Sequence, residues 1–223
     1  MAEEAVATEL PIEAPDMTAT EAHVRTVAML RAALTHALRG VAGVFGEMFL
    51  RVDDRVQVSP DVFAVPGVTT GDRTVYRVPA EPVPSVTIEV LSPKNRTRSG
   101  RAELEAKRAL FGRIGVPLHV EVDREEGFIA VWELRDDTLV RTDLRVDYTS
   151  EAIGRVRIAT PAPGVLRVTL ADGHEVLDVG DELTRAEREA ARAEREAARA
   201  EREAARAEGL AVRLRALGID PDE

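Results

Sequence analysis

The chain has 223 residues, 44% of them hydrophobic, and a formal net charge of −10. This amount of apolar material suits one core of ordinary size with an appendage, and it is too small for two large domains. The sequence contains no cysteine, which excludes disulfides, zinc–thiolate sites and thiol nucleophiles. The acidic charge argues against a strong general binder of DNA, because contact with phosphates would need a local basic patch or a bound cation.

Two features argue against a membrane or secreted protein. No segment approaches the roughly 20 consecutive apolar residues that cross a bilayer. The first residues, Met-Ala-Glu-Glu-Ala, are acidic where a secretory signal would be basic. We therefore expect a cytoplasmic protein without membrane contact.

A loose arm and then a long helix are predicted at the start of the chain. Residues 1–16 mix acidic residues with two prolines and show no periodicity, which is typical of a flexible N-terminal arm. Thr18 and Glu21 have the spacing of a capping box, and apolar residues then recur at helical intervals, so we expect a helix from Thr18 to Arg39. Three polar residues of this helix could face a site, but a solvated face is the favoured interpretation: Glu21, His23 and His36.

Short β-rich segments alternate with a second helix along the rest of the domain. The expected strands are Glu47–Val52, Asp61–Val65, Ser85–Leu91, Leu118–Val122, Phe128–Leu134 and Leu139–Val146. The second helix is expected over Arg101–Ile114, and residues 147–180 are expected to add a small β extension. This order favours an α/β fold with a mixed β-sheet core flanked by helices over an all-α or all-β fold.

The end of the chain is a repetitive tail rich in Ala, Glu and Arg. The heptad Ala-Glu-Arg-Glu-Ala-Ala-Arg occurs three times between Ala186 and Arg206, and its composition favours a helix. Its seam contains only alanine, so a coiled coil along it would be weak before the terminal leucines, and a solvated helix is the alternative. The predicted parts are therefore an arm (1–16), a globular domain (17–180) and a helical tail (181–223).

Two carboxylates are candidates for holding a metal ion. Asp61 follows Pro60 at the start of one predicted strand, and Glu89 lies within another strand that is otherwise apolar. A carboxylate buried as an ion is costly unless a positive charge meets it, and one metal ion would satisfy both side chains. Oxygen ligands suit a hard cation such as Mg²⁺, with Mn²⁺ as an alternative ion. The other interpretation is that Glu89 lies at a sheet edge, either exposed or paired with an arginine.

Lysine is scarce in this sequence, which draws attention to its positions. Of the 30 basic residues, only Lys94 and Lys107 are lysines. Lys107 comes three residues after Leu104 and four before Phe111, so it should point to the core side of the second helix. A lysine beside two carboxylates and a metal could bind a phosphate and orient the attacking water, whereas a buried Lys–Glu bridge without chemistry is the alternative. Lys94, on a loop, is the second candidate, with a solvated surface role favoured.

Several ordered segments resemble the bacterial putative restriction endonuclease family, a branch of the PD-(D/E)XK nuclease superfamily. The segments are Ser59–Gly67, Pro84–Pro93, Lys107–Pro117 and Val120–Asp123, and the ending Leu-Gly-Ile-Asp-Pro of the tail is also similar. The resemblance implies a restriction-endonuclease-like mixed sheet flanked by helices. It also implies that Asp61 and Glu89 are the metal-binding acids and that Lys107 is the catalytic lysine. The superfamily pattern would place that lysine where this chain has Leu91, and no role is assigned to His119.

The resemblance implies a metal-dependent endonuclease that hydrolyses DNA phosphodiester bonds. Asp61 and Glu89, with the Val90 carbonyl as a further candidate ligand, would hold Mg²⁺, and Lys107 would position the attacking water. The alternative is a catalytically inactive nuclease-fold interaction module that acts through its helical tail, which the charge of −9 on residues 1–184 favours. Nucleases that cut both strands commonly act as dimers, and the tail has an a/d-spaced leucine patch that predicts a weak homodimer: Leu210, Leu214 and Leu217.

Overall fold

The computed structural model divides the chain into two units, Met1–Asp178 and Val179–Glu223. The structure describes residues 20–53, 56–71 and 73–177 of the first unit, and Arg192, Arg195, Glu196 and Arg199 of the second. The predicted arm and most of the predicted tail, with its leucine patch, lie outside the described residues. Within the described part of the chain, no helix is long and apolar enough to cross a membrane.

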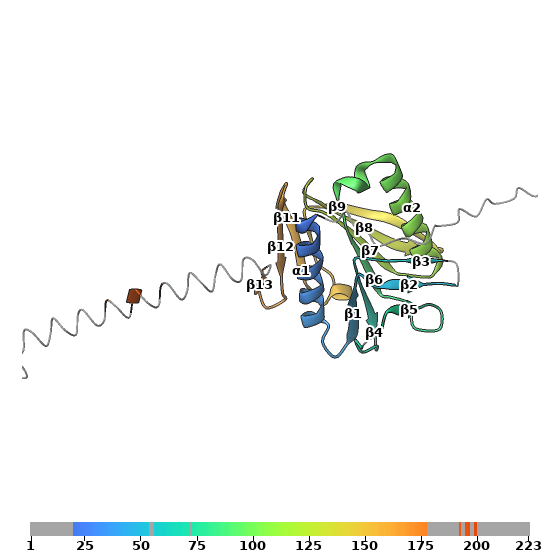
Figure 1. Ribbon diagram of the computed structural model, residues 1–223, viewed down its shortest axis with the longest axis horizontal. Helices are drawn as coiled ribbons and strands as arrows, with labels where there is room; N and C mark the ends of the chain where they lie inside the picture. Colours follow the sequence, from blue (N-terminus) through green and yellow to red (C-terminus); the bar gives the residue numbers. More distant parts are fainter. Residues whose placement is uncertain are drawn as a thin grey trace, which may run out of the picture. The chain divides into compact units, whose positions relative to one another are not determined.

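A six-stranded mixed sheet forms the centre of the first unit (Figure 1). Its strand order is β1-β4-β6-β7-β8-β9, in which β6 and β7 are parallel and all other neighbours are antiparallel. The strands are β1 (Ala42–Gly46), β4 (Val62–Pro66), β6 (Val86–Val90), β7 (Leu118–Asp123), β8 (Phe128–Arg135) and β9 (Thr138–Arg145). The expected mixed α/β architecture is confirmed.

Two smaller sheets accompany the central one. The first has the order β3-β2-β5, with β2 (Phe49–Arg51), β3 (Gln57–Val58) and β5 (Val75–Arg77). The second has the order β10-β11-β12-β13, with β10 (Asp147–Tyr148), β11 (Arg157–Ala162), β12 (Val165–Thr169) and β13 (Glu175–Val176). The second sheet is the β extension expected after residue 147, and two short 3₁₀ helices, η1 (Pro93–Arg96) and η2 (Glu151–Ile153), complete the fold.

Helix α1 packs on one face of the central sheet. It spans Glu21–Ala37. The helix begins later than the sequence pattern predicts because the hydroxyl of Thr20 caps its first turn by accepting from the His23 amide. It also ends earlier than predicted, with Leu38 as its C-cap. The apolar stripe of α1 joins side chains that alternate along the strands to form one buried core. Members of this core include Val27, Leu30, Leu34, Val62, Ile88, Val120 and Ile158.

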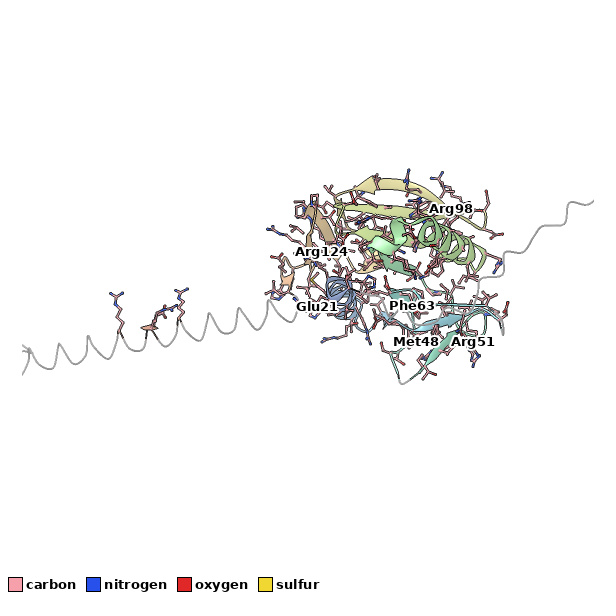
Figure 2. All side chains as sticks on the ribbon, turned by 45° about the horizontal axis from the view of Figure 1, so that its top comes forward. Glu21, Met48, Arg51, Phe63, Arg98 and Arg124 are labelled. Atoms are coloured by element: carbon pink, nitrogen blue, oxygen red, sulfur yellow. The ribbon has the colours of Figure 1, made fainter. Side chains whose placement is uncertain are left out.

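Helix α2 belongs to a second core. It spans Arg98–Arg113 and begins three residues before the predicted start, because Thr97 is its N-cap and accepts from the Gly100 amide. Leu110 and Phe111 of α2 pack with Phe63 of β4, whose side chain is labelled in Figure 2. Val62 and Phe63 are consecutive strand residues that belong to different cores, so the two helices cover opposite faces of the central sheet.

Glycines let other backbone segments approach both ends of α2 closely. A Cβ at Gly100 would lie 2.1 Å from the carbonyl oxygen of Lys94 in η1, and a Cβ at Gly112 would lie 2.7 Å from that of Asp137 in the β8–β9 turn. Neither contact leaves room for a side chain. Helix α2 is therefore seated against η1 at its start and against the β8–β9 turn at its end.

Candidate active site

The register of β4 and β6 places the two predicted acids on neighbouring strands. Val62 pairs with Ile88 and Phe63 with Thr87 in this antiparallel ladder, so one further step sets Asp61 opposite Glu89. The Asp61 side chain also turns toward β6, where its Oδ2 accepts a hydrogen bond from the Val90 amide at 2.6 Å. Asp61 is therefore fixed to the backbone of the residue that follows Glu89.

Glu89 and Lys107 form a buried ion pair. Glu89 is 4% exposed in a strand whose five residues are all buried, and Lys107 is 8% exposed on the inner stripe of α2. Lys107 Nζ lies 3.2 Å from Glu89 Oε2 and donates a second bond to the Ser59 carbonyl at 3.2 Å. The lysine thus links α2 to β6 and to the segment that leads into β4. The interpretation of Glu89 as an exposed edge residue is wrong.

His23 is a member of this cluster that the sequence interpretation assigned to a solvated face. Its Nε2 lies 3.4 Å from Asp61 Oδ1, and its side chain is only 15% exposed. His23 precedes Val27 by four residues and Leu30 by seven, so it lies on the buried stripe of α1. That spacing was the signal that could have identified it. Glu21 and His36 are exposed, as expected.

Lys94 lies on the surface. Its side chain is 45% exposed, and its ammonium lies 3.4 Å from a carboxylate oxygen of Glu103 on α2. Lys94 belongs to the short helix η1, which follows β6. The ion pair with Glu89 is therefore formed by Lys107, the candidate that the sequence favoured.

A second buried carboxylate, Glu121, lies beside the first. β6 and β7 are parallel, and Glu89 and Glu121 are partners in their ladder. Arg108, the residue after Lys107, bonds to Glu121 Oε1, and the indole of Trp132 donates to Glu121 Oε2 at 3.2 Å. The Arg108 guanidinium also stacks on Trp132, 4.3 Å from the ring centroid. Two adjacent residues of α2 thus pair with two adjacent carboxylates of the sheet.

His119 completes this second group as a fully buried side chain. Its Nδ1 lies 2.9 Å from the Thr87 hydroxyl, and its Nε2 lies 3.5 Å from Glu121 Oε1. Burial lowers the pKa of His119 and outweighs the contact with Glu121, which raises it, while the charges of Arg108 and Lys107 add to the lowering. Burial opposes ionisation of Glu121, but contacts with His119 and Arg108 lower its pKa overall. Arg108 is the permanently charged partner among these contacts, and the Trp132 indole adds a hydrogen bond to the same carboxylate.

The sequence decides the family to which this site belongs. The family model of Uma2, described as "Putative restriction endonuclease", matches residues 11–153. The chain belongs to the Uma2 family. No curated protein matches the chain. Among solved structures, it is similar to a putative nuclease of DUF820 from Anabaena variabilis, with a TM-score of 0.47 and 12% identity over 63% of this chain and 79% of that chain.

The donor set of this Uma2 protein suits a hard cation. Asp61 and Glu89 contribute carboxylate oxygens from adjacent strands, and Mg²⁺ commonly takes one or two protein carboxylates and keeps several waters. Within the described residues, no three His, Asp or Glu side chains come together as a preformed metal cluster. Asp61 and Glu89 are therefore candidates for holding a Mg²⁺ ion that keeps several of its waters.

The buried His119 should make this Uma2 protein less stable in acid. The unfolded chain takes up a proton at this residue near pH 6.5, whereas the folded chain holds it neutral, so the free energy of unfolding should fall as the pH drops below that value. The stability associated with neutral His119 is fully present above the pKa of this residue in the unfolded chain. It is lost as the pH falls toward the lower pKa of His119 in the folded chain. Its slope is at most about 1.4 kcal/mol per pH unit.

Urea unfolding between about pH 5 and pH 7.5 measures this slope. His119→Gln should flatten the pH dependence, whatever its effect on absolute stability. His36→Gln, on the exposed face of α1, should leave the slope of the wild type unchanged. Equal slopes for the wild type and His119→Gln would contradict the prediction.

Proposed function

We propose that this Uma2 protein is a divalent-metal-dependent endonuclease that hydrolyses phosphodiester bonds of DNA. The observation that carries the proposal is the buried Glu89–Lys107 pair, with Asp61 bonded to the amide next to Glu89, in a chain of a family described as putative restriction endonucleases. Asp61 and Glu89 would hold Mg²⁺, or Mn²⁺ as the alternative ion, with the Val90 carbonyl as a further candidate ligand. As part of this proposal we place its action in the cytoplasm, as expected from the sequence.

Each residue has a distinct part in the proposed hydrolysis. The water oxygen forms a bond to phosphorus as the water gives up a proton, the bond from phosphorus to one ester oxygen breaks, and that leaving oxygen takes up a proton, so that one water is consumed in all. A bound Mg²⁺ would supply positive charge to the phosphate oxygens and the water. Lys107 would orient the attacking water and offset charge that develops on the phosphate, since its ammonium is already fixed by Glu89 and the Ser59 carbonyl. Asp61 keeps its place through the Val90 amide.

DNA cleavage assays test this proposal directly. Purified protein should cleave plasmid or single-stranded DNA with Mg²⁺ or Mn²⁺, EDTA should stop the reaction, and Glu89→Gln prepared in the same way should be inactive. The variant guards against a contaminating nuclease, because a contaminant would persist in its preparation. Absence of cleavage by the wild type with both ions, where a related nuclease cuts, would overturn the proposal.

We also propose that residues 17–180 form the nuclease domain and that the tail, residues 181–223, assists a weak homodimer whose main contact lies in the nuclease domain. Two sites that face a duplex could cut both strands, and the leucine patch Leu210, Leu214 and Leu217 has a/d spacing but is small. A chain truncated after Leu183 should remain folded, with native circular dichroism, and should dissociate at concentrations where the full chain sediments as a dimer. Identical association states would remove the tail from this proposal, and an insoluble truncation would show that the domain needs the tail.

A further inference from the structure

Two neighbouring basic residues meet two neighbouring carboxylates at the candidate site. Lys107 and Arg108 are consecutive on α2, and Glu89 and Glu121 are partners on adjacent parallel strands. Neighbouring strands are about 4.8 Å apart, so the two carboxylates that these cations bind extend from backbones that lie close together. The observed pairing is Lys107 with Glu89 and Arg108 with Glu121. The exchanged pairing would put a guanidinium on Glu89.

Exchange of the two pairs would alter the site in a specific way. A guanidinium is a planar, permanently charged fork that binds a carboxylate through two parallel bonds, whereas an ammonium is a compact point charge. Arginine on Glu89 would occupy carboxylate oxygens that the proposed cation needs. It would also move the ammonium of Lys107 away from Glu89.

Two side chains hold the Arg108 guanidinium at β7 and β8, away from Glu89. Glu121 accepts from its guanidinium, and the Trp132 ring lies under the same guanidinium at 4.3 Å. Trp132 in turn donates its indole N–H to the second oxygen of Glu121, so the carboxylate and the ring are fixed to each other. Glu121 is 5% exposed, which strengthens its attraction for the cation.

We propose that Glu121 is a positioning residue of the candidate site: together with Trp132 it holds Arg108 away from Glu89, so that Glu89 is paired with Lys107 rather than with Arg108. The inference rests on the proposed function, since it concerns which basic side chain pairs with the proposed metal ligand Glu89. Glu121 itself contacts neither the metal nor the substrate in this account.

Glu121→Gln is the first test, because its side chain keeps an oxygen for the Trp132 indole and loses only the charge. A crystal structure of this variant should show the Arg108 guanidinium on Glu89. The affinity for Mn²⁺, measured by isothermal titration calorimetry, should fall by about tenfold or more. Arg113→Gln removes a charge from the exposed end of the same helix and should leave the affinity unchanged. An Arg108 that stays on Trp132, with the affinity of the wild type, would overturn the inference.

The double variant Glu121→Gln/Arg108→Gln separates positioning from a plain structural role. If Glu121 acts by restraining Arg108, removal of the arginine should return Mn²⁺ affinity to within about threefold of the wild type, because no guanidinium is left to compete for Glu89. If the Arg108–Glu121 bridge only supports the fold, the double variant should be no better than Glu121→Gln, and the inference fails.

A second variant covers the case in which Glu121→Gln does not fold. Trp132 is only half buried, so Trp132→Leu should be tolerated, and loss of the stack and of the indole bond should weaken Mn²⁺ binding severalfold. Unchanged binding in that variant would contradict the inference. A wild-type protein that neither binds Mn²⁺ nor cleaves DNA would overturn the proposed function instead, and the position of Arg108 in the Glu121→Gln crystal would still decide the pairing.

Discussion

Lys107→Arg should lower DNA cleavage by about a hundredfold or more, a change expected of a residue that positions the water. The guanidinium is broader than the ammonium, and the space beside Glu89 and the Ser59 carbonyl holds a side chain that is 8% exposed. Arginine can still pair with Glu89, so the fold should persist. Single-turnover cleavage rates, with circular dichroism and thermal unfolding of the same preparations, measure both effects.

Lys94→Arg is the matched control for this substitution. Its side chain is 45% exposed and pairs with Glu103 at the surface, so arginine should replace it with little change in cleavage. Equal losses from both substitutions would mean that neither lysine is specific to the chemistry. Loss from Lys94→Arg alone would assign the catalytic role to Lys94.

Asp61→Asn should weaken the proposed metal binding while it preserves the local structure. The amide oxygen of asparagine can still accept from the Val90 amide, but the side chain no longer carries a negative charge for a cation. We expect Mn²⁺ affinity to fall by about tenfold or more and cleavage by about a hundredfold or more. Calorimetric titration with Mn²⁺ and cleavage assays across a range of Mg²⁺ concentrations measure these losses.

Asp147→Asn makes the same chemical change in the β10-β11-β12-β13 sheet. Asp147 pairs with Arg157 on an exposed surface, so its substitution should leave metal affinity and cleavage unchanged. If Asp61→Asn binds Mn²⁺ as tightly as the wild type, Asp61 is no ligand, and the metal site must be rebuilt around other residues.

The sequence carried enough information to find Glu89 and Lys107, because each is a polar residue within a local apolar pattern. A strand alternates and a helix repeats every 3.6 residues, so a charge on a buried face stands out within a few positions. The scarcity of lysine added a second signal for Lys107. Strand β1 was missed because Gly43 and Gly46 lower its strand propensity, and β3 has only two residues.

The partners of each charge depend on contacts that local pattern does not encode. The hydrogen bond between Asp61 and the Val90 amide depends on the register of β4 and β6. This register cannot be deduced from the local sequence of either strand. Glu121 lies in a strand that is buried throughout, and its partner Arg108 comes from the preceding helix. His23 reaches Asp61 across 38 positions for the same reason, because tertiary packing brings α1 to the start of β4.

The seating of α2 at both ends bears on how the protein moves. Backbone contacts at Gly100 and Gly112 oppose sliding of the helix along its axis, and Lys107 lies between them. Sliding would push a carbonyl oxygen into the helix at one end, so the lysine should leave Glu89 only when α2 detaches from the sheet altogether. Amide protons of α2 should then exchange with solvent at the free energy of global unfolding, and faster exchange in α2 than in β6 would show a separate opening. A helix held in this way would keep the reach of Lys107 constant during the proposed hydrolysis, and any motion that admits DNA would then come from other parts of the domain.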